Sequence, residues 1–133
     1  MIQNSNAYMK SSLTNDIGLF LLRLVPSLMM LTHGYPKLQK MLNGNFEFAD
    51  PIGLGPTPSL FLTVIAEFLC PVLLIIGFKA RWAALPPAIA MLVAAFIVHG
   101  PDPLGTKELA ILFLTFFVCI MLLGPGRYSI DRK

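Results

Sequence analysis

The sequence contains few charged residues. Only 13% of its 133 residues are Asp, Glu, Lys or Arg, whereas a soluble domain usually has about 25%. Hydrophobic residues make up 56% of the chain, and the mean hydropathy is +0.72. This composition excludes an ordinary soluble domain and is typical of a membrane protein with one compact domain.

Cysteine is also scarce, because the chain has only Cys70 and Cys119. Two cysteines cannot build a disulfide scaffold, and their spacing does not match the C-x-x-C pattern of metal sites. The chain also lacks a C-x-x-C-H haem-attachment motif and a glycine-rich dinucleotide fingerprint. The net charge is +3 without any basic run. We therefore expect neither a metal site nor a nucleic-acid partner.

Four long apolar segments are present, at residues 17–35, 59–78, 82–98 and 107–124. Each has 17 to 20 residues, which at 1.5 Å per residue is long enough for a hydrocarbon core about 30 Å thick. The segments are too long for strands and do not alternate, so they predict helices. The expected fold class is all-α, an integral membrane four-helix bundle.

The polar residues at the two ends of the chain predict tails. Residues 1–16 show no signal-peptide cleavage site, so we expect the first apolar segment to be retained. The predicted organisation is a cytoplasmic N-terminal tail at 1–16, a transmembrane domain at 17–126 and a cytoplasmic C-terminal tail at 127–133. We expect residues 43–58, which are rich in Gly and Pro, to form a long loop between the first two helices.

Basic residues set the expected orientation. The N-terminal tail, the turn at residues 79–81 and the C-terminal tail share one side and carry six Lys or Arg residues. The opposite side carries three, Lys37, Lys40 and Lys107. We therefore expect both termini to lie in the cytoplasm and the long loop to face outward.

Polar or small residues recur at helical spacing in every apolar segment, which predicts that these faces point into the bundle. The stripes, in chain order, are Arg23, Met30, His33, Gly34 and Lys37; Thr63, Glu67, Cys70, Pro71 and Leu74; Ala88, Leu92, Ala95 and His99; and Glu108, Leu112, Thr115 and Cys119.

Arg23 would cost about 2.5–3.5 kcal/mol in lipid without a partner. Glu67 is the only acid in the interior of a predicted helix, and the two residues differ in expected depth by roughly 6 Å at 1.5 Å per residue. We predict an Arg23–Glu67 ion pair inside the bundle. The pair would either lock the first helix to the second or take part in a site.

A second polar cluster is expected at the outward ends of the helices, formed by His33, Lys37, His99, Lys107 and Glu108. Its two histidines could ligate haem or bind a quinone carbonyl, or they could simply contact loops and water. Of the two cofactors we favour quinone over haem. We expect both histidines to border one shared pocket near the outer leaflet.

Three stretches of the chain form a distinctive set. They are "LLRLVPSLMMLTHGYPKLQ" at 21–39, "AEFLCPVLLIIGFKARWAAL" at 66–85 and "KELAILFLTFFVCIMLLGPGRYSID" at 107–131. Together they resemble the DoxX family. The family signature carried over to this chain covers Arg23, His33, Gly34, Lys37, Glu67, Glu108, Gly124, Gly126, Arg127 and Tyr128. The resemblance implies a small four-helix protein of the bacterial inner membrane.

The functional implications of the resemblance concern redox chemistry. Some relatives, of the DoxD type, form part of a thiosulfate:quinone oxidoreductase. Others are membrane components of complexes with thiol-handling and superoxide-removing partners. For this chain the resemblance implies a redox partner or cofactor that comes from elsewhere.

We therefore predict an inner-membrane subunit of a quinone-linked oxidoreductase, embedded in the lipid bilayer and joined to protein partners or to further copies of itself. Its ligand would be a quinone or a small sulfur-containing substrate. The candidate catalytic residues are His33, Glu67 and Glu108, and the candidate cofactor-binding residues are Arg23, Lys37 and His99. Two alternatives stay open, a small-molecule transporter or channel protomer and a membrane anchor for soluble redox partners.

Overall fold

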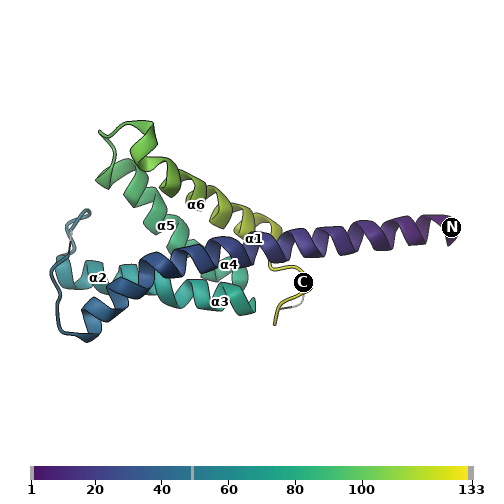
Figure 1. Ribbon diagram of the computed structural model, residues 1–133, viewed down its shortest axis with the longest axis horizontal. Helices are drawn as coiled ribbons and strands as arrows, with labels where there is room; N and C mark the ends of the chain where they lie inside the picture. Colours follow the sequence, from purple (N-terminus) through teal and green to yellow (C-terminus); the bar gives the residue numbers. More distant parts are fainter. Residues whose placement is uncertain (1, 49, 132–133) are drawn as a thin grey trace.

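Four helical spans make up the fold (Figure 1). The structure is a computed structural model that describes residues 2–48 and 50–131, with side chains from residue 12 onward. The spans, each long and apolar enough to cross a membrane, are Ser12–Leu42, Pro56–Ile76, Ala80–Val98 and Leu104–Leu123. The predicted all-α fold class and the number of spans are therefore confirmed for the described residues.

The first span belongs to one continuous helix, α1 (Ile2–Leu42), which extends well beyond the bundle toward the N-terminus (Figure 1). The predicted N-terminal tail is thus helical from Ile2, and the helix ends seven residues later than Tyr35, the end expected from the sequence. The remaining elements are α2 (Pro56–Val64), the π-helix η1 (Ile65–Leu69), α3 (Cys70–Ile76), α4 (Ala80–Ala83), α5 (Leu85–Val93), the π-helix η2 (Ala94–Val98) and α6 (Leu104–Leu123).

A π-helical turn interrupts both the second and the third span. In η1 the N–H of Cys70 donates to the carbonyl of Ile65, and in η2 the N–H of His99 donates to the carbonyl of Ala94 at 3.0 Å. Hydrogen bonds that reach five residues back instead of four change the direction of the side chains in that turn, and such turns are frequent at functional sites.

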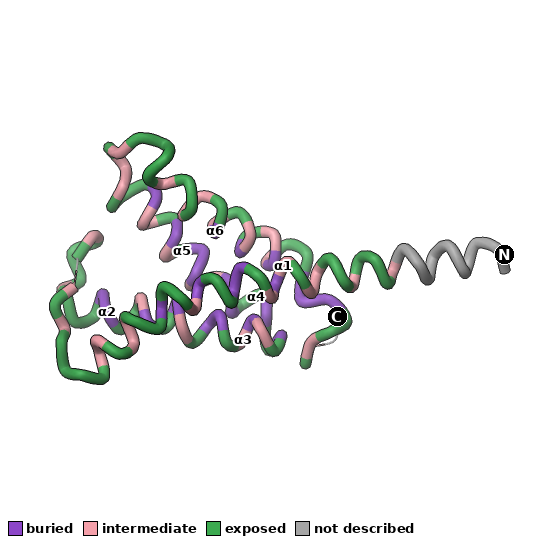
Figure 2. The backbone as a smooth tube through the Cα atoms, in the orientation of Figure 1, coloured by how far each residue is buried: buried purple, intermediate pink, exposed green. Residues whose placement is uncertain are grey.

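The packed core lies in the half of the bundle near the C-terminus of α6 (Figure 2). Small residues on α4 and α5, including Ala80, Ala84 and Ala88, let the helices approach closely there. Toward the opposite end, α5 and α6 diverge from α1 and α2 (Figure 1). A cavity lies at this end, and residues of the 43–55 loop form part of its lining.

The predicted inward stripes are correct for the first two spans, except for His33, and wrong for α6. Glu108, Leu112 and Thr115 are exposed, and the inward face of α6 is formed by Phe113 and Phe117 with Ile120. Thr115 does not need the interior of the bundle, because its hydroxyl donates to the carbonyl of Ile111 at 2.9 Å in its own helix. In the third span, Leu92 is also exposed.

Candidate functional site

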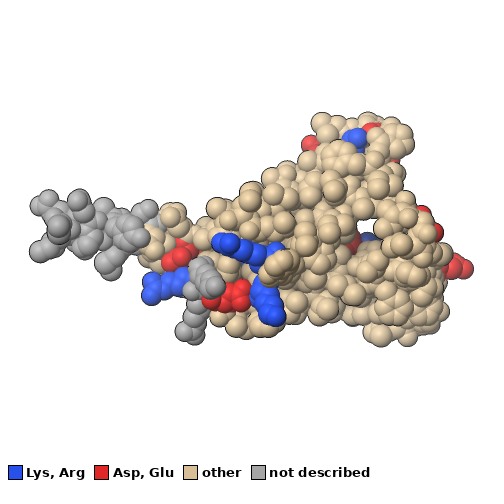
Figure 3. Space-filling view, turned by 180° about the vertical axis from the view of Figure 1, so that it is seen from behind, with Lys and Arg blue, Asp and Glu red and all other residues tan. Residues whose placement is uncertain are grey.

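A cavity of about 520 Å³ lies between the second and third spans. It is at the end where one arm, α5 and α6, diverges from the other arm, α1 and α2 (Figure 1). Figure 3 shows the surface hollowed between the arms, with acidic and basic atoms visible inside the hollow. The lining residues are Lys37, Phe48, Pro51, Ile52, Leu54, Ser59, Leu62, Thr63, Ile65, Ala66, Glu67, Leu85, Pro86, Ile89, Ala90, Met91, Val93, Ala94, Val98 and His99. The cavity is therefore mostly apolar, with a few polar groups on its wall.

Lys37 and Glu67 form an ion pair on this wall, with the Lys37 ammonium donating to Oε2 of Glu67. The side chain of Glu67 is 5% exposed and that of Lys37 is 30% exposed. A carboxylate so deeply buried stays charged only when it is paired and hydrogen-bonded. Lys37 therefore stabilises the charge of Glu67, while its own ammonium still reaches the cavity.

Gly34 explains how α1 comes so close to η1. A Cβ atom at this position would overlap the backbone carbonyl of Glu67 and would lie 2.9 Å from the backbone nitrogen of Phe68. Only glycine permits this approach. The Gly34 contact sets the distance between the two helices, and Lys37, one turn later on α1, then meets the carboxylate of Glu67.

His99 follows the C-terminal end of η2 and also lines the cavity. Its Nδ1 is 2.9 Å from Oδ2 of Asp102, and both side chains are about 40% exposed. Asp102 belongs to the loop between η2 and α6. Lys107 binds the same loop, because its ammonium donates to the carbonyl of Gly100 at 3.2 Å. One member of a second polar pair, His99, therefore lies on the cavity wall.

The loop before α2 covers part of the cavity through Phe48. The Lys37 ammonium lies 6.0 Å from the centre of this ring, and that of Lys40 lies 5.9 Å from it. Both distances fit cation–π contacts. Two lysines of α1 thus hold an aromatic side chain beside the ion pair.

The predicted Arg23–Glu67 pair is wrong. Arg23 is buried, but its guanidinium donates to the carbonyls of Leu74 at 2.9 Å, Ile75 at 3.0 Å and Tyr128. Glu67 lies about 12 Å further along the second span, at 1.5 Å per residue. Arg23 therefore joins α1 to the C-terminal end of α3 and to the C-terminal tail.

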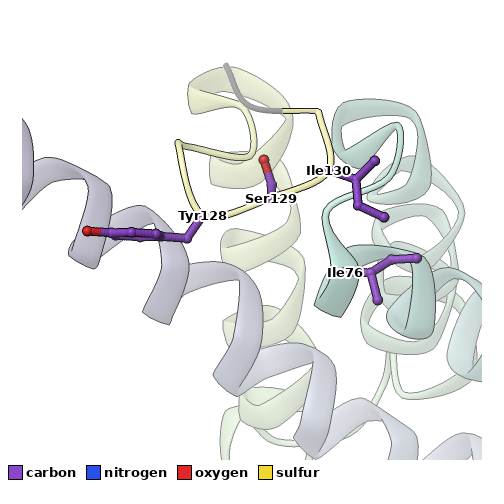
Figure 4. A pocket seen from close by; sticks show the side chains of 4 residues that line it. All are labelled: Ile76, Tyr128, Ser129 and Ile130. Carbon is purple, nitrogen blue, oxygen red and sulfur yellow. The ribbon is translucent and has the colours of Figure 1, made fainter.

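The contact between the C-terminal tail and the end of α3 was not predicted from the sequence. The backbone of the tail pairs with the end of α3 through the N–H groups of Ile130 and Asp131, and the Asp131 carboxylate accepts from the N–H groups of Lys79 and Ala80, each at 2.9 Å. A surface hollow of about 740 Å³ beside it is lined by Ile76, Tyr128, Ser129 and Ile130 (Figure 4). None of these four residues is charged, so we place the candidate site in the smaller cavity.

The shared histidine pocket is also wrong. His99 lines the cavity, but His33 is exposed and packs edge-on against Phe113 of α6, with ring centroids 6.0 Å apart. Glu108 is exposed and is absent from the cavity wall. Of the six candidate site residues, the cavity brings together Lys37, Glu67 and His99.

Metal-ligand chemistry finds no support in the described part of the chain. No group of three or more His, Cys, Asp or Glu side chains is placed there to hold a metal ion. Cys70 and Cys119 are both free thiols, the first buried and the second partly buried.

Comparison with known proteins agrees with the motifs around Arg23, Gly34, Lys37 and Glu67. The family model described as DoxX matches residues 18–100. The chain belongs to the DoxX family. With four apolar spans, this DoxX protein is a multi-pass membrane protein.

The curated relatives cover most of the chain. Inner membrane protein YqjF of Escherichia coli is 30% identical over 88% of this chain and 92% of its own length. An uncharacterised protein of Haemophilus influenzae is 29% identical over 84% of this chain and 87% of its own length. CatD of Bacillus subtilis, whose name proposes an oxidoreductase, is 30% identical over 87% of this chain and 86% of its own length. No solved structure matches the chain.

Proposed function

We propose that the protein is an inner-membrane subunit of a quinone-linked oxidoreductase and that its cavity holds the quinone headgroup. The observation that carries the proposal is the Lys37–Glu67 pair on the wall of an otherwise apolar cavity. Sites for small molecules combine apolar walls with a few placed polar groups in this way. The name of the Bacillus subtilis relative supports the same class of activity.

The residues of the cavity fit a quinone. The Lys37 ammonium has three N–H donors, of which Glu67 takes one, so it can also donate to a carbonyl oxygen of the ring. The apolar walls, contributed by residues such as Leu62, Ile89 and Val93, suit the ring and a hydrocarbon tail. Wall residues such as Leu62 and Ile89 are about half exposed, so the cavity is open to its surroundings, which supports access from the lipid.

A quinone supplies two-electron chemistry, since it takes up two electrons and two protons to become a hydroquinone. In this proposal Glu67 would hold and release a proton on the cavity wall, and Lys37 would supply the positive charge and N–H donors there. His99, held by Asp102, connects the cavity to water. The electrons come from a partner protein or from a small sulfur-containing substrate.

The packing beside the cavity favours a binding site instead of a channel, because buried side chains close the interior of the bundle. Met30, Leu74, Phe113 and Phe117 fill the bundle there, and each is at most 2% exposed. A continuous aqueous path through the interior would have to displace these side chains. The described residues offer no comparable observation in favour of a transporter or of a pure anchor.

The proposed orientation places both termini in the cytoplasm, because six of the nine Lys and Arg residues near the ends of the spans lie on that side. The cavity then opens near the outer leaflet.

A binding experiment with a matched control tests the proposal. Val93→Phe adds volume on the cavity wall, whereas Val118→Phe adds the same volume on the exposed face of α6. We expect a short-chain ubiquinone to bind the parent protein and the Val118 variant in nanodiscs, and to bind the Val93 variant at least tenfold more weakly. Equal binding by both variants would exclude this cavity, and no saturable binding to the parent would exclude the function.

A further inference from the structure

Charge is divided unequally between the two ends of the bundle. The end with the turn between α3 and α4 holds the described cations Arg23, Lys79, Arg81 and Arg127 and the acids Asp16 and Asp131. The end with the cavity holds Lys37, Lys40 and Lys107 and the acids Glu47, Asp50, Glu67, Asp102 and Glu108. The first end is therefore net positive and the second net negative. In Figure 3 basic side chains gather at the first end, close to acidic ones.

Three of these cations, Lys79, Arg81 and Arg127, are exposed, and contacts of their side chains or of the adjacent backbone hold them in place. Arg81 lies against the C-terminal end of α6, where a Cβ on Gly124 would be 2.9 Å from its Nη2 atom. Lys79 is held by its N–H group, which donates to Asp131 at 2.9 Å. Arg127 directly precedes Tyr128, whose carbonyl binds the buried Arg23. Arg81 and Arg127 thus stand beside the end of α6, and Lys79 stands beside the tail that follows it.

The neighbouring acid, Asp131, offsets only one of the three exposed positive charges. Asp131 uses one carboxylate oxygen for the N–H of Lys79 and the other for the N–H of Ala80. Both oxygens therefore bind the backbone of the turn, and no ion pair joins Asp131 to an exposed cation among the described residues, so the surface stays net positive.

Two amphipathic aromatic side chains indicate that this surface lies at the level of the lipid headgroups. Trp82, the only tryptophan of the chain, follows Arg81 and is 75% exposed. Tyr128 follows Arg127 and is 48% exposed. Such side chains favour the level of the lipid headgroups, where the ring meets apolar chains and the N–H or O–H meets water.

We propose that Lys79, Arg81 and Arg127 form a binding surface for the headgroups of anionic phospholipids. Guanidinium groups match the planar, bidentate geometry of phosphate oxygens, and a lysine adds a point charge. A headgroup such as phosphatidylglycerol carries a net negative charge, whereas the ammonium of a zwitterionic headgroup is repelled by the same cations. This surface lies at the opposite end from the cavity and is independent of any quinone.

The single tryptophan provides the test. The protein is reconstituted in phosphatidylcholine vesicles that contain a fixed mole fraction of phosphatidylglycerol, and bromine is carried by the acyl chains of one lipid or the other. We expect brominated phosphatidylglycerol to quench Trp82 more than its mole fraction predicts. Neutralising one contacting cation should lower this preference about fivefold.

Matched variants separate the surface from general charge effects. Arg81→Gln with Arg127→Gln should remove most of the preference, whereas Lys40→Gln with Lys107→Gln at the opposite end should leave it unchanged. The circular dichroism of each reconstituted variant confirms that the helices are intact. Equal quenching by the two brominated lipids, or a preference that the Arg81/Arg127 variant retains, would overturn the proposal. Competition by millimolar inorganic phosphate that abolishes the preference would assign the surface to free phosphate and would also overturn it.

Discussion

Lys37 of α1 pairs with Glu67 of η1, and the pair stands on the wall of the cavity between the second and third spans. It is the point where packing and proposed chemistry meet, because Gly34 brings the two helices together just one turn before Lys37. The same residues that close the helix interface therefore place a charged pair against an apolar space.

Breaking this pair from one side should destabilise the protein. In Glu67→Leu the ammonium of Lys37 loses its partner but is partly exposed, so water can hydrate it. In Lys37→Met the buried carboxylate of Glu67 is left without a partner. We expect Lys37→Met to cost about 3 kcal/mol and Glu67→Leu to cost less. The double variant should recover much of the loss, because no orphan charge remains. Thermal unfolding in detergent measures all three, and a double variant with the summed loss of the single variants would show that the pair is not coupled.

The close contact at Gly34 predicts a strong effect of one methyl group. Gly34→Ala should destabilise the protein by about 1–3 kcal/mol, because the new Cβ forces α1 away from η1. Gly18→Ala is the matched control, since a Cβ there meets nothing within 4 Å. That change should be neutral or stabilising by about 0.5–1 kcal/mol. Similar unfolding temperatures for the two variants would contradict the close approach.

Arg23 should act on the C-terminal tail and not on Glu67. Arg23→Leu removes the donor to three carbonyls, at a cost of about 1–3 kcal/mol for each carbonyl that stays buried. Hydrogen exchange should therefore accelerate at Ile130 and Asp131, whose amides tie the tail to α3. The losses of Arg23→Leu and Glu67→Leu should add within about 0.5 kcal/mol. A double variant more stable than Arg23→Leu alone would instead show that Arg23 and Glu67 pair directly.

The four spans could be predicted from the sequence because long apolar runs admit few other structures in lipid. The ends of the helices could not. The polar stretch before Ile17 continues α1, and the helix also continues through Pro36 to Leu42. That change of end shifts the register of α1 against the second span. It brings Lys37, instead of Arg23, to the depth of Glu67.

The site was only partly predictable for a related reason. Helical spacing correctly assigned Glu67 and Lys37 to the interior, since charges in the membrane need partners. It failed for Glu108 and Thr115, because a polar side chain near a helix end reaches water and a hydroxyl can bond to its own helix. The two π-helical turns at the cavity have no signature in the sequence that we could use.

The orientation can be tested by labelling single cysteines in a variant that lacks Cys70 and Cys119. A membrane-impermeant maleimide added to intact spheroplasts should label a cysteine at position 50 and should spare one at position 5 until the membrane is permeabilised. The charge distribution is the physical reason, because basic loops are retained in the cytoplasm. Labelling of position 5 alone in intact spheroplasts would reverse the orientation and place the cavity at the inner leaflet.

Photolabelling with an azido-quinone tests the central claim most directly, because it reports where the ring binds. The protein in nanodiscs is irradiated with the analogue, digested and mapped by mass spectrometry, with and without excess ubiquinone as competitor. We predict that competitor-sensitive label falls on η1 and η2, at residues such as Ala66, Ala94 and Val98 on the cavity wall. Label confined to the exposed face of α6, or label that excess ubiquinone does not reduce, would contradict a quinone site at the Lys37–Glu67 pair.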